Sequence, residues 1–327
     1  MKKLFVICIS VFISTNWLMA IANNEQPRDP IIIRSFPASS IRSVEVSTSG
    51  GSITVSGDAD SQAVVEVYVS RDDRWSDDQI RQMLKENYNI EIDVRNGKLY
   101  AVAKAKNNKM NRNTQRLSIS FKISVPRQVN SLLNTSGGSI KISNMSGSQD
   151  FKTSGGSLMV ENVSGKIVGR TSGGSINVTG ASDEIDLKTS GGSINATNCS
   201  GKIELRTSGG SIRLTELNGN INASTSGGSI NANNIKGALN AGTSGGSINV
   251  TMESVIDYLK LSSSGNVNLT LPAGKGYNLN VKANANIQTS QLDNFRGNID
   301  SKNMAGTIAN GGPEIDVKAS KVSLIFK

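Results

Sequence analysis

The stretch TSGGSINVTGASDEIDLK, residues 171–188, is one unit of an internal repeat that decides the fold. Its opening hexapeptide, Thr-Ser-Gly-Gly-Ser followed by Ile or Leu, recurs at a constant spacing of 18 residues. The seven copies in strict register begin at Thr135, Thr153, Thr171, Thr189, Thr207, Thr225 and Thr243. An eighth copy begins at Thr48, and a degraded copy, SSGNV, occupies residues 263–267. A fixed period of this kind indicates a repeat architecture in which each unit stacks on its neighbours.

The apolar columns of the repeat indicate how each unit folds. Position six is Ile or Leu in every copy, position eight is Ile, Val, Leu or Ala, and position seven between them is mostly polar. A second alternating pair occupies positions fifteen and seventeen, as in Ile185 and Leu187. Alternation with a period of two predicts strands, and the Ser-Gly-Gly and Asn-x-Ser-Gly segments between them predict turns. Each unit is therefore expected to contain two short strands joined by two turns.

Stacking such units in register produces a single-stranded parallel β-helix, in which each strand pairs with its equivalent in the next coil. The glycine pairs would supply either positive φ or close backbone approach at one corner. The Thr and Ser columns would form hydroxyl ladders along the axis. A left-handed helix of six-residue steps also fits a period of 18, but its apolar positions six residues apart are not seen. The sequence favours an all-β, right-handed β-solenoid with 18-residue coils and two main sheets.

The chain is expected to contain four segments. Lys2 and Lys3, the apolar residues 4–12, and Ala20-Ile21-Ala22 predict a signal peptide over residues 1–22, with an uncleaved membrane anchor as the alternative. Residues 23–130 predict an N-terminal β-solenoid cap with strands at 31–33, 44–46, 53–55, 63–69, 90–94, 99–104 and 117–125, and one helix over 76–89. Residues 131–267 are the regular array, and residues 268–327 are C-terminal coils and a cap. The leader places the mature protein in the periplasm, at the cell surface or outside the cell.

Three features together resemble a known family. They are the Ser-Gly-Gly-Ser-Ile rungs, the leader, and the closing segment LTLPAG at residues 269–274 followed by Tyr277-Asn278-Leu279. In these features the sequence resembles the bacterial β-strand-repeat proteins labelled putative adhesin, and the resemblance covers most of residues 40–327. It implies a β-solenoid on the exported side of the membrane, and it implies no catalytic residue and no cofactor.

Composition argues against several kinds of active site. The chain has no histidine and two cysteines, of which Cys8 lies in the leader. Histidine-based triads and imidazole metal sites are therefore excluded. Cys199 occupies position eleven, an apolar column that predicts a packed and inert thiol. A calcium-binding roll needs an acidic residue after each glycine turn, whereas the acidic group Asp183, Glu184 and Asp186 occurs in one coil, so no metal site is expected.

The array also lacks the features of a polysaccharide-cleaving β-helix. Residues 153–256 contain no insertion, no aromatic residue and few carboxylates, so neither a cleft nor a stacking surface for a sugar is expected. Ice binding would need two outward Thr columns on one flat face. The sequence has only one regular Thr column, beside the glycine corner, so ice binding is not expected. The protein is accordingly expected not to be an enzyme.

The stretch from Arg95 to Arg127 contains nine basic residues and no acidic one, although the net charge of the whole chain is only +9. Strands at 99–102 and 118–121 flank the segment 104–113 and suggest a hairpin with a cationic tip. The tip charges, candidates for binding an anion or another partner, are Lys104, Lys106, Lys109, Arg112 and Arg116.

Two interpretations of this tip remain open. It is either a solvated edge whose charges prevent strand aggregation, or a site for lipopolysaccharide, membrane phosphates or an acidic polymer. Nucleic acid is less favoured because aromatic residues do not interleave the basic ones. The leading hypothesis is a structural or adhesion module of the bacterial envelope with an anionic component or glycan as partner and peripheral membrane contact. The alternative is a polysaccharide-binding or polysaccharide-modifying β-helix protein, and the oligomeric state is left open.

Overall fold

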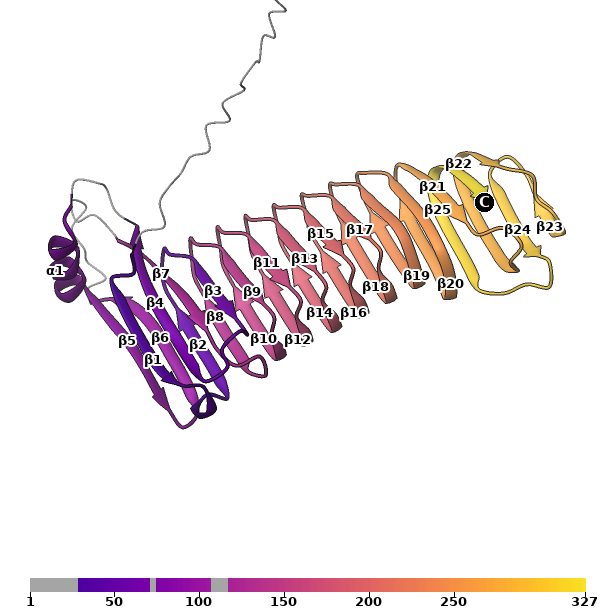
Figure 1. Cartoon of the computed structure of the whole chain (residues 1–327). Helices are drawn as coiled ribbons and strands as arrows, with labels where there is room; N and C mark the ends of the chain where they lie inside the picture. The colour runs from indigo at the N-terminus through magenta and orange to yellow at the C-terminus, as the bar shows by residue number, and fades with distance from the viewer. Residues whose placement is uncertain (1–28, 71–74, 107–116) are drawn as a thin grey trace, which may run out of the picture.

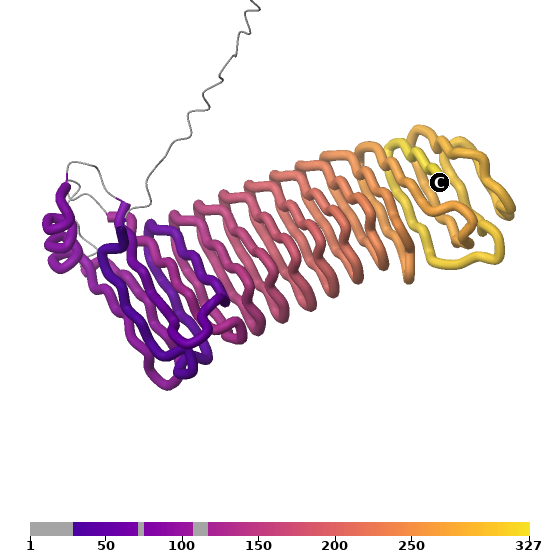
Figure 2. Tube along the Cα trace, viewed as in Figure 1, coloured from indigo at the N-terminus to yellow at the C-terminus, as the bar shows by residue number. Residues whose placement is uncertain are grey.

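The computed structural model describes residues 29–70, 75–106 and 117–327. The chain forms a long rod whose coils follow one another from the end that carries helix α1 to the opposite end (Figures 1 and 2). Its described residues hold 25 strands, one α-helix and one short 3-10 helix, η1 (Ala38–Ser40). All the strands belong to one mostly parallel sheet that winds around the axis of the rod.

Two walls run along the rod, and each coil contributes one strand to each wall. The first wall contains the strands that enter the Ser-Gly-Gly corner, and the second wall contains those that leave it. The first wall is built from β2 (Ser43–Ser47), β6 (Lys98–Ala105), β8 (Asn130–Asn134), β10 (Ser146–Lys152), β12 (Ser164–Arg170), β14 (Ser182–Lys188), β16 (Ser200–Arg206) and β18 (Asn218–Thr225). The second wall is built from β3 (Ile53–Ser56), β7 (Ser118–Ser124), β9 (Ile140–Ser143), β11 (Leu158–Glu161), β13 (Ile176–Thr179), β15 (Ile194–Thr197), β17 (Ile212–Thr215) and β21 (Asn266–Leu271).

Four longer strands bend around a corner and belong to both walls. They are β19 (Ile230–Thr243), β20 (Ile248–Ser263), β22 (Tyr277–Thr289) and β25 (Glu314–Phe326). The two main sheets expected from the sequence correspond to the two walls, and these longer strands join the walls into one 25-stranded sheet. The backbone stays extended on both sides of the corner in β19, where two residues have positive φ, Asn234 at 56° and Gly237 at 114°.

The register between coils confirms the expected inward and outward columns. From β8 to β19 each paired residue lies 18 positions from its partner, as in Ile176 with Ile194 and Ile194 with Ile212. The register shifts by one or two residues where β19 pairs with β20 and β20 pairs with β21. Ile212 and Ile230 expose none of their surface, whereas Arg213 between two inward residues is exposed. The inward columns of all coils form one continuous apolar cluster along the rod. Burial of these columns is the main source of stability for a stack of this kind.

The glycine pairs are required by close backbone approach and not by positive φ. A Cβ atom on Gly174 would lie 2.0 Å from the carbonyl oxygen of Gly156 in the preceding coil. The equivalent approaches at Gly156 and Gly192 are 2.0 and 2.1 Å. The first glycine of each pair has more room, since a Cβ atom on Gly173 would lie 3.6 Å from its nearest neighbours. The second glycine therefore allows consecutive coils to stack at this corner.

The Thr column beside this corner forms a ladder of hydrogen bonds between coils. The Oγ1 hydroxyl of Thr189 donates to the carbonyl oxygen of Gly174 at 2.8 Å and accepts from the N–H of Gly192 at 3.3 Å. In the Ser column, the N–H of Ser193 donates to Oγ of Ser175 at 3.3 Å. The hydroxyls thus bond to backbone groups and not to one another. Thr189 is fully buried, so its hydroxyl satisfies polar groups that water does not reach.

At the opposite corner of the coil, several residues adopt the left-handed backbone conformation, with positive φ. Position ten has φ 54° at Asn162 and 53° at Asn198, and position thirteen has φ 100° at Gly165. Asn and Gly tolerate this region at lower cost than other residues. Asp183 occupies position thirteen with φ 81°, and its Oδ2 accepts a hydrogen bond from the N–H of Gly165 at 2.8 Å.

The N-terminal end is built from coils stacked out of sequence order and closed by antiparallel strands. Strands β2 and β3 lie between the coil of β6 and β7 and the coil of β8 and β9. Beyond them, β5 (Tyr88–Arg95) is antiparallel to β6, β4 (Gln62–Ser70) is antiparallel to β7, and β1 (Ile32–Pro37) is antiparallel to β4. Helix α1 (Asp77–Asn87) begins with the expected capping box between Ser76 and Gln79.

The C-terminal end is also stacked out of order. Strand β25 lies between the coil of β20 and β21 and the earlier strand β22. Strand β24 (Asn303–Ile308) is antiparallel to β22, and β23 (Phe295–Ile299) is antiparallel to β24. Both ends of the regular array are thus followed by coils whose neighbours are distant in sequence.

Candidate functional site

The basic stretch does not form the hairpin expected from the sequence. Strand β6 pairs with β5 and β2, and strand β7 pairs with β4 and β3. Both edges of each strand are therefore occupied, so β6 and β7 do not pair with each other. They lie on different walls, and residues 107–116 between them lie outside the described residues. Thr48 Oγ1 donates to the carbonyl oxygen of Ile119, as other corner threonines do to glycine.

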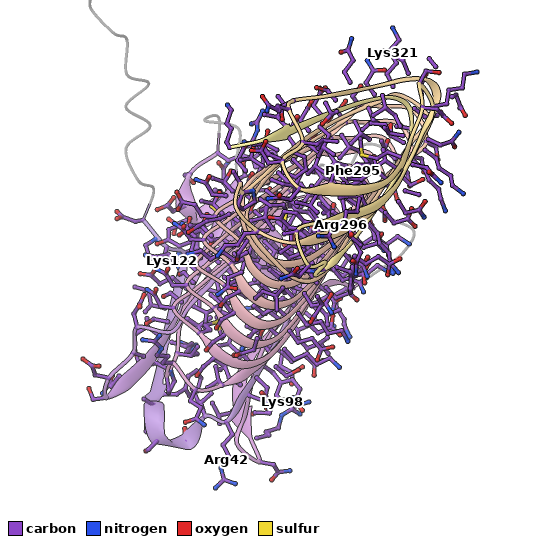
Figure 3. The ribbon with its side chains drawn as sticks, turned by 90° about the vertical axis from the view of Figure 1, so that its right-hand side faces the viewer. Arg42, Lys98, Lys122, Phe295, Arg296 and Lys321 are labelled. Atoms are coloured by element: carbon purple, nitrogen blue, oxygen red, sulfur yellow. The ribbon has the colours of Figure 1, made fainter. Side chains whose placement is uncertain are left out.

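Several cations of the stretch are paired with carboxylates. Lys98 Nζ lies 3.3 Å from Glu45 on the first wall, and this hydrogen bond raises the pKa of Lys98. Lys122 Nζ lies 2.9 Å from Glu66 among the second-wall strands, and the pKa of Lys122 is raised by the same kind of contact. Figure 3 shows Lys98 and Lys122 on different sides of the rod. The basic residues of this stretch that the structure describes therefore do not form a single patch.

Two of the five predicted tip residues lie within the described residues. Lys104 is exposed on β6 opposite Asn89 of β5, and no ion-pair partner is found for it in the described part of the chain. Lys106 is exposed, and its Nζ donates to the carbonyl oxygen of Lys85 near the end of α1. Lys109, Arg112 and Arg116 lie outside the described residues.

A pocket of about 470 Å³ lies beside these lysines at the N-terminal end of the rod. It is bounded by β1, α1 and β5. Its residues are Ile31, Ile32, Arg81, Leu84, Lys85, Tyr88, Asn89, Ile90 and Glu91. The sequence analysis did not predict this pocket, because it is formed by segments that are 50 residues apart and meet only through the out-of-order stacking.

The first wall carries charges in its outward columns. Basic residues stand at position eighteen in four consecutive coils, as Lys152, Arg170, Lys188 and Arg206. Acidic residues stand at position sixteen, and Arg170 forms an ion pair with Asp186. Arg206 pairs with Glu204 at 2.9 Å, and Lys202 approaches Glu184 at 4.0 Å. Opposite charges are thus interspersed along this wall.

The second wall is almost uncharged from β13 to β21. Its outward positions five, seven and nine are occupied by Ser, Asn and Thr with Arg213 as the exception. The amide of Asn195 donates to Asn177 at 2.9 Å, Asn249 donates to Asn231 at 2.8 Å, and Asn268 donates to Asn249 at 2.7 Å. This wall was not predicted from the sequence. The Thr column noted there, at position one, is buried, whereas the threonines at position nine, such as Thr197, point outward and mark the wall.

Cys199 is buried with 1% of its surface exposed, as the apolar column predicted. Burial raises the pKa of its thiol, and backbone hydrogen bonds oppose this effect only in part. Across residues 29–70, 75–106 and 117–327, no group of three or more Cys, Asp or Glu residues is placed to hold a metal ion. Asp183 and Asp186 instead contact Gly165 and Arg170 of the neighbouring coil.

No helix within the described ranges combines the length and apolar character needed to span a bilayer. The predicted signal peptide, residues 1–22, lies outside those ranges.

Comparison with known proteins identifies structural matches among bacterial adhesion proteins. No protein-family model matches the sequence, and no curated protein matches it. A putative cell adhesion protein from Clostridium sporogenes aligns with 90% of this chain and 98% of its own, at 11% identity and a TM-score of 0.22. A putative adhesin from Bacteroides fragilis aligns with 73% of this chain and 95% of its own, at 17% identity and a TM-score of 0.35. Both matched structures are of bacterial proteins described as a putative adhesin or a putative cell adhesion protein, the label of the family that the sequence resembles.

Proposed function

We propose that the protein is an exported, non-enzymatic β-solenoid that serves as a structural or adhesion module of the bacterial cell envelope. The observation that carries the proposal is the unbroken register of the array, whose outward columns repeat from coil to coil without an inserted loop. Such a rod offers long walls for contact, and we propose that it winds as the right-handed solenoid that the apolar columns favour.

Cell fractionation tests the location. Chain cleaved after Ala22 is expected in the periplasmic, outer-surface or secreted fraction of the source cells. N-terminal sequencing of that chain checks the cleavage site. Uncleaved chain in the cytoplasmic fraction would contradict the proposal.

The partner that we propose for the N-terminal end is an anionic component of the envelope. Lys104 and Lys106 are exposed beside Lys85, and Lys109, Arg112 and Arg116 follow them in the sequence. Each basic residue near an anionic surface contributes about 1 kcal/mol, and salt screens this attraction over about 10 Å at 0.1 M. Binding should therefore decrease steeply between low and physiological salt.

Vesicle co-sedimentation tests this partner. Changing Lys104, Lys106, Lys109, Arg112 and Arg116 together to Ser should abolish binding to anionic vesicles and leave the melting temperature nearly unchanged. A matched control changes five exposed lysines of the array to Ser, namely Lys152, Lys166, Lys188, Lys202 and Lys236. Absence of binding by the parent protein at low salt, or equal loss in the control, would exclude the basic end as the contact.

The second candidate function is binding of a neutral polysaccharide along the second wall. The Asn ladder holds amides at fixed positions in register. Within the described residues, the outward hydroxyl of Thr197 beside it makes no hydrogen bond to the protein and is available to a ligand. A glycan array tests it with Asn195, Asn231 and Asn249 changed to Lys. The control changes Asn220, Asn222 and Asn240 on the first wall, and equal binding by both variants would argue against a role for the second wall.

A further inference from the structure

The pocket at the N-terminal end is an opening into the apolar interior of the rod. Ile31, Leu84 and Tyr88 belong to the continuous core cluster and expose 9%, 5% and 9% of their surface. Ile32 and Ile90 are half-buried and complete the apolar floor. The volume of about 470 Å³ lies in the range of small-ligand sites.

The pocket forms where the stack of coils ends, at the strands β1 and β5. Within the described residues, β1 pairs only with β4, and β5 pairs only with β6. Among the described residues, no further coil covers the inward side chains of these two strands, and α1 lines one side of the opening. The ring of Tyr88 is held in place because its hydroxyl accepts from the N–H of Leu117 at 2.9 Å. The floor is therefore preformed.

Cations dominate the rim of the pocket. Arg81 Nη1 donates to the carbonyl oxygen of Ile31 at 2.8 Å, which holds the guanidinium at the edge of the floor. Lys85 is exposed on the same helix and also lines the pocket. The one acidic lining residue, Glu91, forms an ion pair with Arg95. A ligand with an apolar tail and a negative head group would therefore match both parts of the site.

We propose that this pocket binds a single-chain fatty carboxylate, with its acyl chain on the Ile32, Leu84 and Ile90 floor and its carboxylate at Arg81 and Lys85. The apolar chain would cover the side chains that the last strands leave half-exposed. The carboxylate would accept charge-assisted hydrogen bonds from the guanidinium and the ammonium group. This inference stands apart from the proposed adhesion role, because it needs only the geometry of the pocket.

Isothermal titration calorimetry with the mature chain tests the proposal. Dodecanoate, below its micelle-forming concentration, should bind, and dodecyltrimethylammonium, which has the same tail and the opposite charge, should bind at least about tenfold more weakly. Ile90→Trp, which fills the pocket, should abolish dodecanoate binding. Lys85→Glu should weaken it about tenfold.

Two variants away from the pocket serve as matched controls. Ile299→Trp enlarges another exposed strand residue at the opposite end of the rod, and Lys236→Glu reverses an exposed charge on the array. Neither should change dodecanoate binding, and all variants should melt as the parent does. The proposal is overturned if the parent does not bind dodecanoate, if Ile90→Trp binds it fully, or if both amphiphiles bind equally. Vesicle binding without dodecanoate binding would support the basic end and exclude the pocket.

Discussion

The two walls of the rod share one interior and differ in their outward residues. On the first wall, cations and carboxylates alternate and form ion pairs such as Arg170 with Asp186. On the second wall, between β13 and β21, Arg213 is the exception among Ser, Asn and Thr. Inward residues of both walls are equally buried, as Ile203 and Ile212 are, with 1% and 0% exposed.

This difference separates the residues that build the coil from those that remain available for contact. The inward columns are almost entirely apolar because each residue packs against its equivalents in both neighbouring coils. Gln149 is a buried polar residue in one of these columns, where its side chain accepts from the Ser131 hydroxyl and donates to the carbonyl oxygen of Val129. The outward columns accept ions on one wall and amides on the other without any change of register. The chemistry of a wall is therefore independent of the fold, and a partner that approaches the rod meets either a charged or an uncharged wall.

The largest expected effect comes from breaking the shared interior. Ile212→Asp would place an unpaired charge in the core, which should cost several kcal/mol, roughly 4. Arg213→Asp, one residue away and outward, should cost less than about 0.5 kcal/mol. Urea denaturation of both variants measures the difference. Equal losses would show that the inward and outward columns are wrongly assigned.

The next effect concerns the corner that joins the walls. Gly174→Ala would bring a Cβ atom to 2.0 Å from a backbone carbonyl oxygen, so one coil would have to shift, at a cost of about 3 kcal/mol. Gly173→Ala, with 3.6 Å of clearance, should change the free energy of unfolding by less than about 1 kcal/mol. Thermal melts compare the two, and a larger loss for Gly173→Ala would reverse the assignment of the close approach.

A smaller effect is expected from the hydroxyl ladder. Thr189→Val removes a buried hydroxyl and leaves the carbonyl oxygen of Gly174 without that donor, which should cost about 1–3 kcal/mol. Thr197→Val on the second wall changes a partly exposed hydroxyl and should cost under about 0.5 kcal/mol. Chemical denaturation of the pair checks this ordering. Identical midpoints would mean that the buried ladder contributes nothing.

The smallest effect distinguishes the walls by their response to salt. Arg170→Met removes a half-exposed ion pair on the first wall, so its cost of at most about 1 kcal/mol should shrink as salt increases. Asn195→Ala interrupts the amide ladder, and its cost of about 0.5 kcal/mol should not depend on salt. Melting temperatures at 0.05 M salt, where the Debye length exceeds about 10 Å, and at 1 M salt, where it is about 3 Å, test both expectations. A salt-dependent loss for Asn195→Ala would contradict the uncharged character of the second wall.

The sequence predicted the interior of the array well because its signal repeats in every coil. Ile176, Ile194 and Ile212 occupy one column in the sequence and one buried row in the structure. The capping box of α1 was also predictable, because Ser76 and Gln79 carry a local signal. For the glycine pairs at the corner, the sequence allowed two explanations, positive φ or close backbone approach. Choosing between positive φ and close approach required the distance between Gly174 and Gly156.

The ends of the rod were less predictable because their pairing is not local. Nothing in the residues of β6 and β7 shows that β2 and β3 occupy one edge of each, so a hairpin was the simplest interpretation. The basic residues Lys98 and Lys122 then separate onto different walls. The pocket also depends on this arrangement, since Ile31 and Ile90 meet only when β1 and β5 end their walls. Its single sequence signal was the apolar alternation of Ile90, Ile92 and Val94.

The out-of-order strand β25 has a consequence for how the rod is made. Strand β22 emerges from the ribosome before β25, yet it stacks on the array only through β25. Growth of the stack by adding coils in the order of synthesis must therefore stop after β21. The edge of β21 therefore remains unpaired until residues 314–326 have been synthesised and pair with it as β25. Completion of this end is a late, long-range step, which makes the final coils the slowest part of the rod to assemble.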